Sequence, residues 1–249
     1  MTGGGERPRH WPSPHCETVA ADVVMTDEAA ASRGQEARRI LEDSGAILHG
    51  GHFVYISGDH GDGWIDKDAI FPHTERVSRL AELLAAAIGG REIDVVCGPA
   101  TGGLIVSQWT AHHLGLPSVF AEHGKEHGYD PRAAQPGPLR PPFVLKRGYD
   151  RLVAGKRVLV VDDVINTGGS VAETGAAVKA AGGQVATVAA ICSRGNAGPA
   201  EVRCNDYVWL VEVQIPSWPA ADCELCRRGV PINTRFAHGA DFLAAQQAV

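Results

Sequence analysis

Short apolar runs without polar alternation recur along the middle of this chain and constrain its fold more than any other feature. They occupy residues 93–97, 117–121, 158–161, 185–192 and 207–213. Patterns typical of helices lie between them at residues 104–114 and 171–181. A strand that is apolar throughout must be buried on both faces, and a parallel sheet covered by helices provides that environment. The sequence therefore predicts an α/β fold with a central parallel sheet.

The two ends of the chain differ in composition from this middle part. The first residues are rich in Gly, Pro and polar side chains and predict a flexible tail. A helical pattern with Gly45 as its expected C-terminal cap follows, and short strands cut by glycines precede an amphipathic helix over residues 74–88. The expected organisation is a tail at residues 1–26, a helix with short strands at 27–90, an α/β core at 91–213 and a C-terminal segment with a tail at 214–249.

Charge and hydropathy exclude several classes of protein. The net charge of -6 and the pI near 6.0 provide no basic field that would attract nucleic acid or an anionic membrane. No apolar run approaches the roughly 18 residues of a membrane span. The first residues also lack the apolar stretch of a signal peptide. We therefore expect a cytoplasmic protein with neither nucleic acid nor a membrane as its partner.

The six cysteines are scattered through a chain that is long enough to bury a core, so a disulfide framework is not expected. Only Cys223 and Cys226 have the C-x-x-C spacing of metal ligands. Cys204 and His238 are candidate distant partners for a zinc site. The alternative is a plain turn near the C-terminus.

Residues 158–170, VLVVDDVINTGGS, place two acids and a turn of small residues directly after a buried run. Small side chains let backbone amides converge where the next helix begins, and a helix N-terminus attracts anions, so we expect a phosphate-sized site. Ser170 and Glu173 also fit a capping box, in which both residues would serve only to cap the N-terminus of the helix. Capping requires neither Asp162 nor Asp163, and adjacent carboxylates repel each other unless hydroxyls or a divalent cation bind them. A ribose phosphate would satisfy both the acids and the turn.

The loop over residues 122–142 holds five prolines and is too long for a simple connection. Loops of this length inside a compact domain are typical of lids or of disordered linkers. Its cationic and imidazole groups, Lys125 and His127, favour a lid that closes over an active site.

The stretch VLVVDDVINTGGS resembles the phosphoribosyl pyrophosphate (PRPP) signature of the type I phosphoribosyltransferases. Further segments resemble the orotate phosphoribosyltransferases of that family: GHFVYISGDHGDGWIDKD, GPATGG, KEHG and ADCELCRRGVPI. The resemblance covers residues 44–235 approximately. It implies a type I phosphoribosyltransferase fold, in which helices flank a central parallel sheet and the N- and C-terminal segments form a small hood.

The resemblance also implies roles for particular residues. As catalytic residues, Asp162 and Asp163 would bind the ribose hydroxyls, while Lys125 and His127 would close over the pyrophosphate in the active site of the neighbouring subunit of a homodimer. The implied PRPP-binding residues are Pro99, Ala100, Thr101, Gly102, Gly103, Asp162, Asp163, Asn166, Thr167, Gly168, Gly169 and Ser170. The expected base-binding residues are Arg194, which matches the orotate-binding arginine of the family, Asn166, Trp64 and Phe53, the two aromatic residues being core candidates as well.

The implied reaction joins a nucleobase, with orotate as the expected one, to PRPP and releases pyrophosphate, a step of pyrimidine nucleotide biosynthesis. Mg²⁺ is the implied cofactor, held mainly through PRPP, with Asp162 and Asp163 as candidate ligands. Transfer to a purine or uracil, and a regulator that binds PRPP without turnover, are the alternatives. The chain departs from the family in its basic groups, because Glu122 and His123 replace an Arg-Lys pair and Gly102 stands where some members carry lysine.

Overall fold

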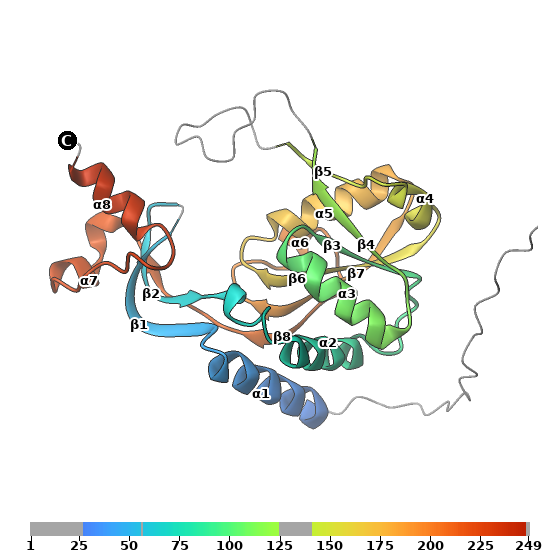
Figure 1. Ribbon diagram of the computed structural model, residues 1–249, viewed down its shortest axis with the longest axis horizontal. Helices are drawn as coiled ribbons and strands as arrows, with labels where there is room; N and C mark the ends of the chain where they lie inside the picture. The colour runs from blue at the N-terminus through green and yellow to red at the C-terminus, as the bar shows by residue number, and fades with distance from the viewer. Residues whose placement is uncertain (1–26, 56, 125–140, 248–249) are drawn as a thin grey trace, which may run out of the picture.

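The computed structural model describes residues 27–55, 57–124 and 141–247, which form two sheets and their covering helices (Figure 1). The helices are α1 Asp27–Asp43, α2 Thr74–Ile88, α3 Gly102–Leu114, α4 Tyr149–Val153, α5 Gly169–Ala180, α6 Pro199–Val202, α7 Glu224–Arg227 and α8 Gly239–Gln247, with short 3-10 helices η1 Lys67–Ala69 and η2 Ala220–Asp222. The strands are β1 Ile47–Val54, β2 His60–Ile65, β3 Val95–Pro99, β4 Ser118–His123, β5 Phe143–Val144, β6 Arg157–Ile165, β7 Gln184–Ser193, β8 Tyr207–Glu212 and β9 Ser217–Trp218.

The larger sheet has the strand order β5-β4-β3-β6-β7-β8. Its strands are parallel except for β5, which pairs with β4 in the antiparallel sense. This arrangement confirms the predicted α/β fold with a central parallel sheet. The order along the chain reverses between the neighbours β3 and β6, and in open α/β sheets the crevice outside the carboxyl ends of such neighbours is the usual ligand site.

The apolar run of β6 lacks alternation because both faces of the sheet are covered (Figure 1). Leu159 and Val161 belong to a core that includes residues of α1, α2 and α3. Val158 and Val160 belong to a second core that includes residues of α4, α5 and α6. All four side chains are fully buried. The sheet therefore separates two apolar cores, and β6 contributes alternate side chains to each.

The helix predicted over residues 74–88 is confirmed as α2. Gly45 follows α1 in the left-handed conformation and its amide donates to the Glu42 carbonyl, so the predicted cap is confirmed as well. The capping box predicted at Ser170 is wrong. Helix α5 begins at Gly169, two residues earlier than predicted, Gly168 is its N-cap, and no side-chain hydrogen bond caps it.

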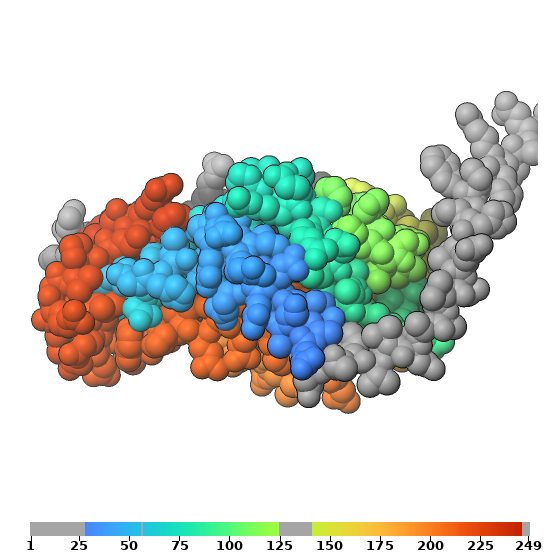
Figure 2. Space-filling view, turned by 90° about the horizontal axis from the view of Figure 1, so that it is seen from below, coloured from blue at the N-terminus to red at the C-terminus, as the bar shows by residue number. Residues whose placement is uncertain are grey.

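The smaller sheet has the order β1-β2-β9 and is antiparallel. It joins segments from the two ends of the chain, since β1 and β2 form a hairpin and β9 lies far along the sequence. The C-terminal segment also donates backbone hydrogen bonds to β1, from Asn233 to the His52 carbonyl at 2.7 Å and from His238 to the Val54 carbonyl at 2.9 Å. Figures 1 and 2 show these segments side by side at one end of the molecule.

Among the described residues, no helix is both long enough and apolar enough to cross a membrane.

Candidate active site

The two adjacent acids lie inside β6 and not in a loop after it. The strand was predicted to stop at residue 161, but it continues to Ile165 because it pairs with β7 through Asp162 and Val164, opposite Ala190 and Cys192. Successive residues of a strand point to opposite faces. Asp162 consequently lines a small cavity at the start of α5, whereas Asp163 lines a larger cavity beside the β1–β2 hairpin.

Burial and mutual repulsion control the charge of the acid pair. Asp162 and Asp163 are 7% and 5% exposed, and each carboxylate accepts a hydrogen bond from the next backbone amide, at 2.9 and 2.7 Å. Burial, followed by the negative charge of Asp163, raises the pKa of Asp162 well above its ordinary value. The ammonium of Lys67 in η1 lies 3.3 Å from Asp163 Oδ2. Burial lowers the pKa of Lys67, but the interactions with Asp163, Asp162 and Asp68 together outweigh that effect and leave the pKa raised.

One carboxylate oxygen of the pair has unused acceptor capacity. Asp163 Oδ2 is buried and accepts no hydrogen bond within the described residues, because its contact with Lys67 is an ion pair without hydrogen-bond geometry. A buried acceptor of this kind is normally satisfied by a donor or a cation. Vicinal hydroxyls or a hard divalent cation fit this site, since both bind carboxylate oxygens.

The turn after β6 forms a small cradle at the N-terminus of α5. It encloses a cavity of about 110 Å³ lined by Asp162, Val164, Ile165, Asn166, Thr167, Gly168, Gly169, Ser170 and Val171. Gly168 has φ +79°, and a Cβ there would lie 3.1 Å from the carbonyl carbon of Glu201, so a side chain would be both strained and crowded. The first amides of α5 have no partner within the helix, and the helix dipole adds positive potential. The cradle is therefore suited to a phosphate.

The loop after β3, together with the first two residues of α3, lies directly on the acid pair. A Cβ at Gly102 would be 1.8 Å from Asp163 Oδ2, and one at Gly103 would be 2.8 Å from Asp162 Oδ1. Only glycine lets the loop backbone approach both carboxylates so closely. The same Cβ at Gly102 would lie 3.1 Å from the Lys67 ammonium. Lys67 of η1 therefore places a positive charge beside Gly102 and Asp163.

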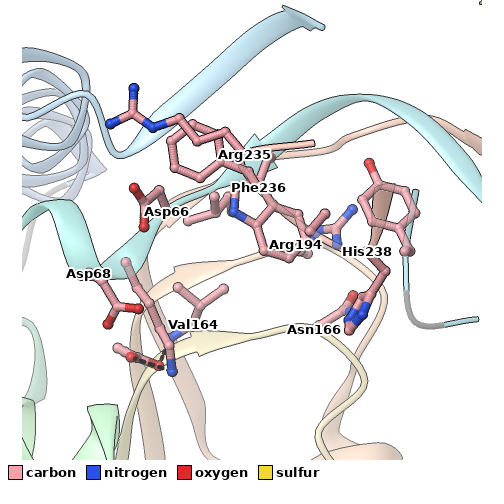
Figure 3. A pocket seen from close by; sticks show the side chains of 14 residues that line it. Asp66, Asp68, Val164, Asn166, Arg194, Arg235, Phe236 and His238 are labelled. Atoms are coloured by element: carbon pink, nitrogen blue, oxygen red, sulfur yellow. Dashed lines mark hydrogen bonds and ion pairs between the residues drawn. The ribbon is translucent and has the colours of Figure 1, made fainter. Parts of the chain in front are cut away.

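The larger cavity has a volume of about 480 Å³ and is lined by three separate parts of the chain. The β1–β2 hairpin and η1 contribute Tyr55, Trp64, Ile65, Asp66, Lys67 and Asp68; the core contributes Asp163, Val164, Asn166 and Arg194; and the C-terminal segment contributes Arg235, Phe236, Ala237 and His238. Figure 3 shows Asp66 and Asp68 along one side and Asn166 and His238 along the other, with Val164 below.

Arg194, which was predicted to bind the base, lines this cavity. It follows β7, and its amide donates to the Ile165 carbonyl at 2.9 Å. Its guanidinium carbon lies 5.0 Å from the ring centroid of Tyr55, and its Nε is buried without a hydrogen-bond acceptor among the described residues. Burial raises the pKa of Tyr55 although the charge of Arg194 opposes the shift. The guanidinium thus retains donors for an anionic ligand.

The other expected base-binding residues lie in different environments. Trp64 lines the cavity and stacks on Tyr55 with ring centroids 6.2 Å apart. Asn166 lines both cavities, and its Oδ1 accepts a hydrogen bond from Asn196. The prediction that Phe53 binds the base is wrong, because its side chain is 2% exposed and packs in the core without lining the cavity.

The lid residues Lys125 and His127 lie outside the described residues. The base of the loop is described, and there Glu122 and His123 of β4 pair with Val144 and Phe143 of β5. Glu122 forms an ion pair with Arg147, and the ammonium of Lys146 lies 3.9 Å from its other oxygen. The negative charge that replaces a family cation is therefore compensated by neighbours on the opposite side of the loop.

Comparisons with known proteins agree with this geometry. The family model described as phosphoribosyl transferase domain matches residues 66–221. Curated orotate phosphoribosyltransferases of Pelotomaculum thermopropionicum and Heliobacterium modesticaldum are 36% and 37% identical, each over 77% of this chain and over 91% and 92% of their own lengths. The chain belongs to the orotate phosphoribosyltransferase family. The solved structure of the orotate phosphoribosyltransferase from Aeropyrum pernix, at 26% identity, has a TM-score of 0.53 over 70% of this chain and 92% of its own.

Sequence reasoning missed several residues of this phosphoribosyltransferase site. Lys67 stands between two aspartates just after a strand, and this was the only local feature of the sequence that could have indicated a role in the site. Arg235, Phe236 and His238 belong to a C-terminal segment whose packing on β1 no local pattern reveals. Tyr55, which positions Arg194, had no signal beyond its place in a family-like segment.

The prediction that Cys204 and His238 complete a zinc site with the C-x-x-C pair is wrong. Cys204 is buried in the second core, where its thiol donates to the Asp206 carbonyl at 3.4 Å. His238 lines the larger cavity and contacts Asp241. The described residues that lie beside Cys223 and Cys226 are two histidines of the β1–β2 hairpin, His52 and His60.

Proposed function

We propose that the chain transfers the 5-phosphoribosyl group of PRPP to orotate and releases pyrophosphate. One observation carries the proposal: an anion cradle, a pair of acids and a cavity with an available guanidinium adjoin one another in that order. Asp162 and Asp163 face the two cavities, and Asn166 lines both. A nucleotide has its phosphate, ribose and base in the same order. Relatives named as orotate phosphoribosyltransferases support orotate as the base.

In this proposal the protein mainly positions its substrates. The cradle would hold the 5-phosphate, Asp162 and Asp163 would accept the ribose hydroxyls, and Arg194 would bind the orotate carboxylate in a bidentate fashion. The ring nitrogen gives up its proton to solvent and forms the new bond to C1 of the ribose, while the bond to pyrophosphate breaks and its electron pair leaves with pyrophosphate. Fixed orientation and exclusion of water favour transfer over hydrolysis.

We propose Mg²⁺ as the cofactor, held mainly through PRPP, with Asp162 and Asp163 as candidate protein ligands. The unused acceptor of Asp163 Oδ2 fits a hard cation that prefers oxygen. When bound, the ion would neutralise the charge of the departing pyrophosphate.

We infer a homodimer in which Lys125 and His127 of one subunit close over the pyrophosphate of the other. The resemblance of the loop to the family lid supports this inference. The two strands at the base of the loop, β4 and β5, lie at the edge of the sheet beside β3, whose following loop would hold the pyrophosphate.

A base screen tests the proposed activity. The purified full-length chain is incubated with PRPP, Mg²⁺ and one base at a time, and pyrophosphate release is followed. Orotate should be the preferred substrate over uracil, adenine and hypoxanthine. Turnover of one of those bases without turnover of orotate would overturn the assignment of the base. Binding of PRPP without turnover of any base would indicate a regulator.

Replacing Arg194 tests the assignment of the base cavity. Arg194→Ala should lower kcat/KM for orotate by about a hundredfold or more, because a lost charge-assisted pair of hydrogen bonds costs roughly 3 kcal/mol. The affinity for PRPP should change little. Arg151→Ala, on the exposed surface of α4, is the matched control and should retain activity. An equal loss of PRPP and orotate binding in Arg194→Ala would contradict the proposed orientation.

A further inference from the structure

A cluster of four metal-binding side chains lies apart from the acid pair, between the β1–β2 hairpin and α7. His52 and His60 come from β1 and β2, Cys223 is the N-cap of α7, and Cys226 lies within that helix. One ligand atom from each residue lies within 4.8 Å of all the others. None of the four lines the base cavity, so the cluster requires an explanation of its own.

Three sulfur-to-nitrogen separations within the cluster match those of a tetrahedral site. With Zn–S bonds of about 2.3 Å and Zn–N bonds of about 2.0 Å, neighbouring ligand atoms lie about 3.3 to 3.8 Å apart. The thiol of Cys226 is 3.7 Å from His52 Nε2 and 3.3 Å from His60 Nδ1. The thiol of Cys223 is 3.6 Å from His52 Nε2. The two ring nitrogens are 2.8 Å apart, so the rings would have to separate by about 0.5 Å.

The orientation of His52 is set from outside the cluster. Its Nδ1 lies 2.8 Å from the Val230 carbonyl, and because a carbonyl only accepts, Nδ1 must carry the proton. The lone pair of the neutral ring is then on Nε2, which points at the two thiols. A second hydrogen bond that fixes the tautomer of a ligand histidine is the usual arrangement in metal sites.

Three of the four side chains of the cluster are buried. His52, His60 and Cys223 are 1%, 0% and 0% exposed, and both cysteines are free thiols. The other nitrogen of His60, Nε2, has no hydrogen-bond partner among the described residues, and the ring packs edge-to-face on Phe242. His60 Nδ1 is therefore the nitrogen of this ring that has polar neighbours. Cys226 is the exposed member of the cluster. A shared cation would bind one atom of each of the four residues, in place of their present contacts with one another.

We propose that His52, His60, Cys223 and Cys226 bind a structural Zn²⁺ ion. Two thiolates and two imidazoles in a closed tetrahedral arrangement favour zinc over Mg²⁺ or Ca²⁺, which prefer oxygen ligands. All four positions are filled by protein, so the ion has no open site for catalysis. The proposal is independent of the substrate of the enzyme.

The ion would cross-link the C-terminal segment to the β1–β2 hairpin. Its ligands belong to β1, β2 and α7, and the backbone of Asn233 is hydrogen-bonded to the carbonyl of His52 itself. Shortly after Asn233 come Arg235 and His238, which line the base cavity. Loss of the ion should therefore loosen one wall of that cavity while the PRPP cradle, on the other side of the acid pair, stays intact.

Metal content is the primary test. The full-length chain is purified in reductant without added metal, and zinc is measured by inductively coupled plasma mass spectrometry. We expect one zinc per chain, and a loss of more than tenfold in Cys226→Ser and in His52→Gln. The matched controls are Cys204→Ser and His238→Gln, which should keep their zinc. Loss of zinc in these controls with retention in His52→Gln would overturn the assignment of ligands.

X-ray absorption of the wild-type zinc protein covers the case in which a variant fails to fold. The expected coordination is two sulfurs at about 2.3 Å and two nitrogens at about 2.0 Å. Replacement by Co²⁺ should produce the visible bands of a tetrahedral site with thiolate charge transfer. A coordination shell made only of oxygen, a Cys223–Cys226 disulfide in freshly reduced protein, or failure to bind either Zn²⁺ or Co²⁺ would each overturn the proposal. None of these readouts depends on activity, so the proposed reaction and the zinc site can fail separately.

Discussion

Replacing Gly102 by alanine should damage the PRPP site through a single methyl group. The added Cβ would lie 1.8 Å from Asp163 Oδ2, whereas such contacts are essentially never below 3.0 Å. Either the carboxylate or the loop backbone must therefore move by about 1 Å. Both movements change the position of groups that would hold the ribose and the pyrophosphate.

The size of the effect follows from the contacts that this movement breaks. Asp163 would lose its 2.7 Å hydrogen bond from the Val164 amide, which is worth about 1.5 to 3 kcal/mol for a charged acceptor. Its ion pair with Lys67 adds at most about 1 kcal/mol, because the lysine side chain is 45% exposed. We expect a loss of stability of about 1 to 3 kcal/mol. A displacement of about 1 Å at a reacting centre can lower kcat/KM by about a hundredfold.

Steady-state kinetics with PRPP as the varied substrate, together with thermal unfolding, would measure both effects. Gly175→Ala is the matched control, since it adds a methyl group to a buried position of α5 where the nearest atom is a side-chain methyl of Val185 at 3.3 Å. It should retain full activity and change the unfolding free energy by less than about 1 kcal/mol. A folded Gly102→Ala enzyme with kcat/KM for PRPP within about threefold of wild type would refute the close approach of the loop to Asp163.

Further predictions concern the acid pair and the lid. Because the folded state raises the pKa of Asp162, ionisation of this residue opposes folding above the ordinary aspartate pKa, so Asp162→Asn should raise the free energy of unfolding at pH 7. The gain should vanish below about pH 4, where the wild-type residue is protonated in both states, and urea unfolding across this range would measure it. A less stable variant at pH 7 would contradict the shift. The same variant should bind PRPP more than tenfold more weakly by calorimetry, since a charge-assisted hydrogen bond is lost. For the lid, inactive Lys125→Ala and Asp163→Asn chains should partly restore activity when mixed, and no restoration despite proven subunit exchange would exclude a shared site.

Features that depend on local backbone chemistry could be predicted from the sequence. The apolar runs predicted a buried parallel sheet, because a strand covered on both faces cannot alternate with polar residues. The amphipathic period predicted α2, and the glycines after the acids predicted a turn at the start of α5. The signature around Asp162 and Asp163 indicated the family, which the comparisons confirm.

The length of β6 and the choice between the two aromatic candidates depended on strand pairing. Polar residues such as Asp162 normally end a buried run, yet pairing with β7 carries the strand past them. Phe53 and Trp64 lie on paired strands of one hairpin, but only Trp64 faces the base cavity. Register decides which side of a strand faces a cavity, and a shift of one residue would reverse it.

Contacts between distant segments were decided only by the tertiary structure. Lys67 reaches Asp163 from η1, and the C-terminal segment completes the base cavity from the opposite end of the chain. The sequence indicated that Cys223 and Cys226 could bind a metal, but their neighbours His52 and His60 come from the N-terminal hairpin, and His52 lies 174 positions before Cys226. Spacing along the chain specifies partners only within one turn or one hairpin. Beyond that range, the packing of whole elements determines which side chains meet.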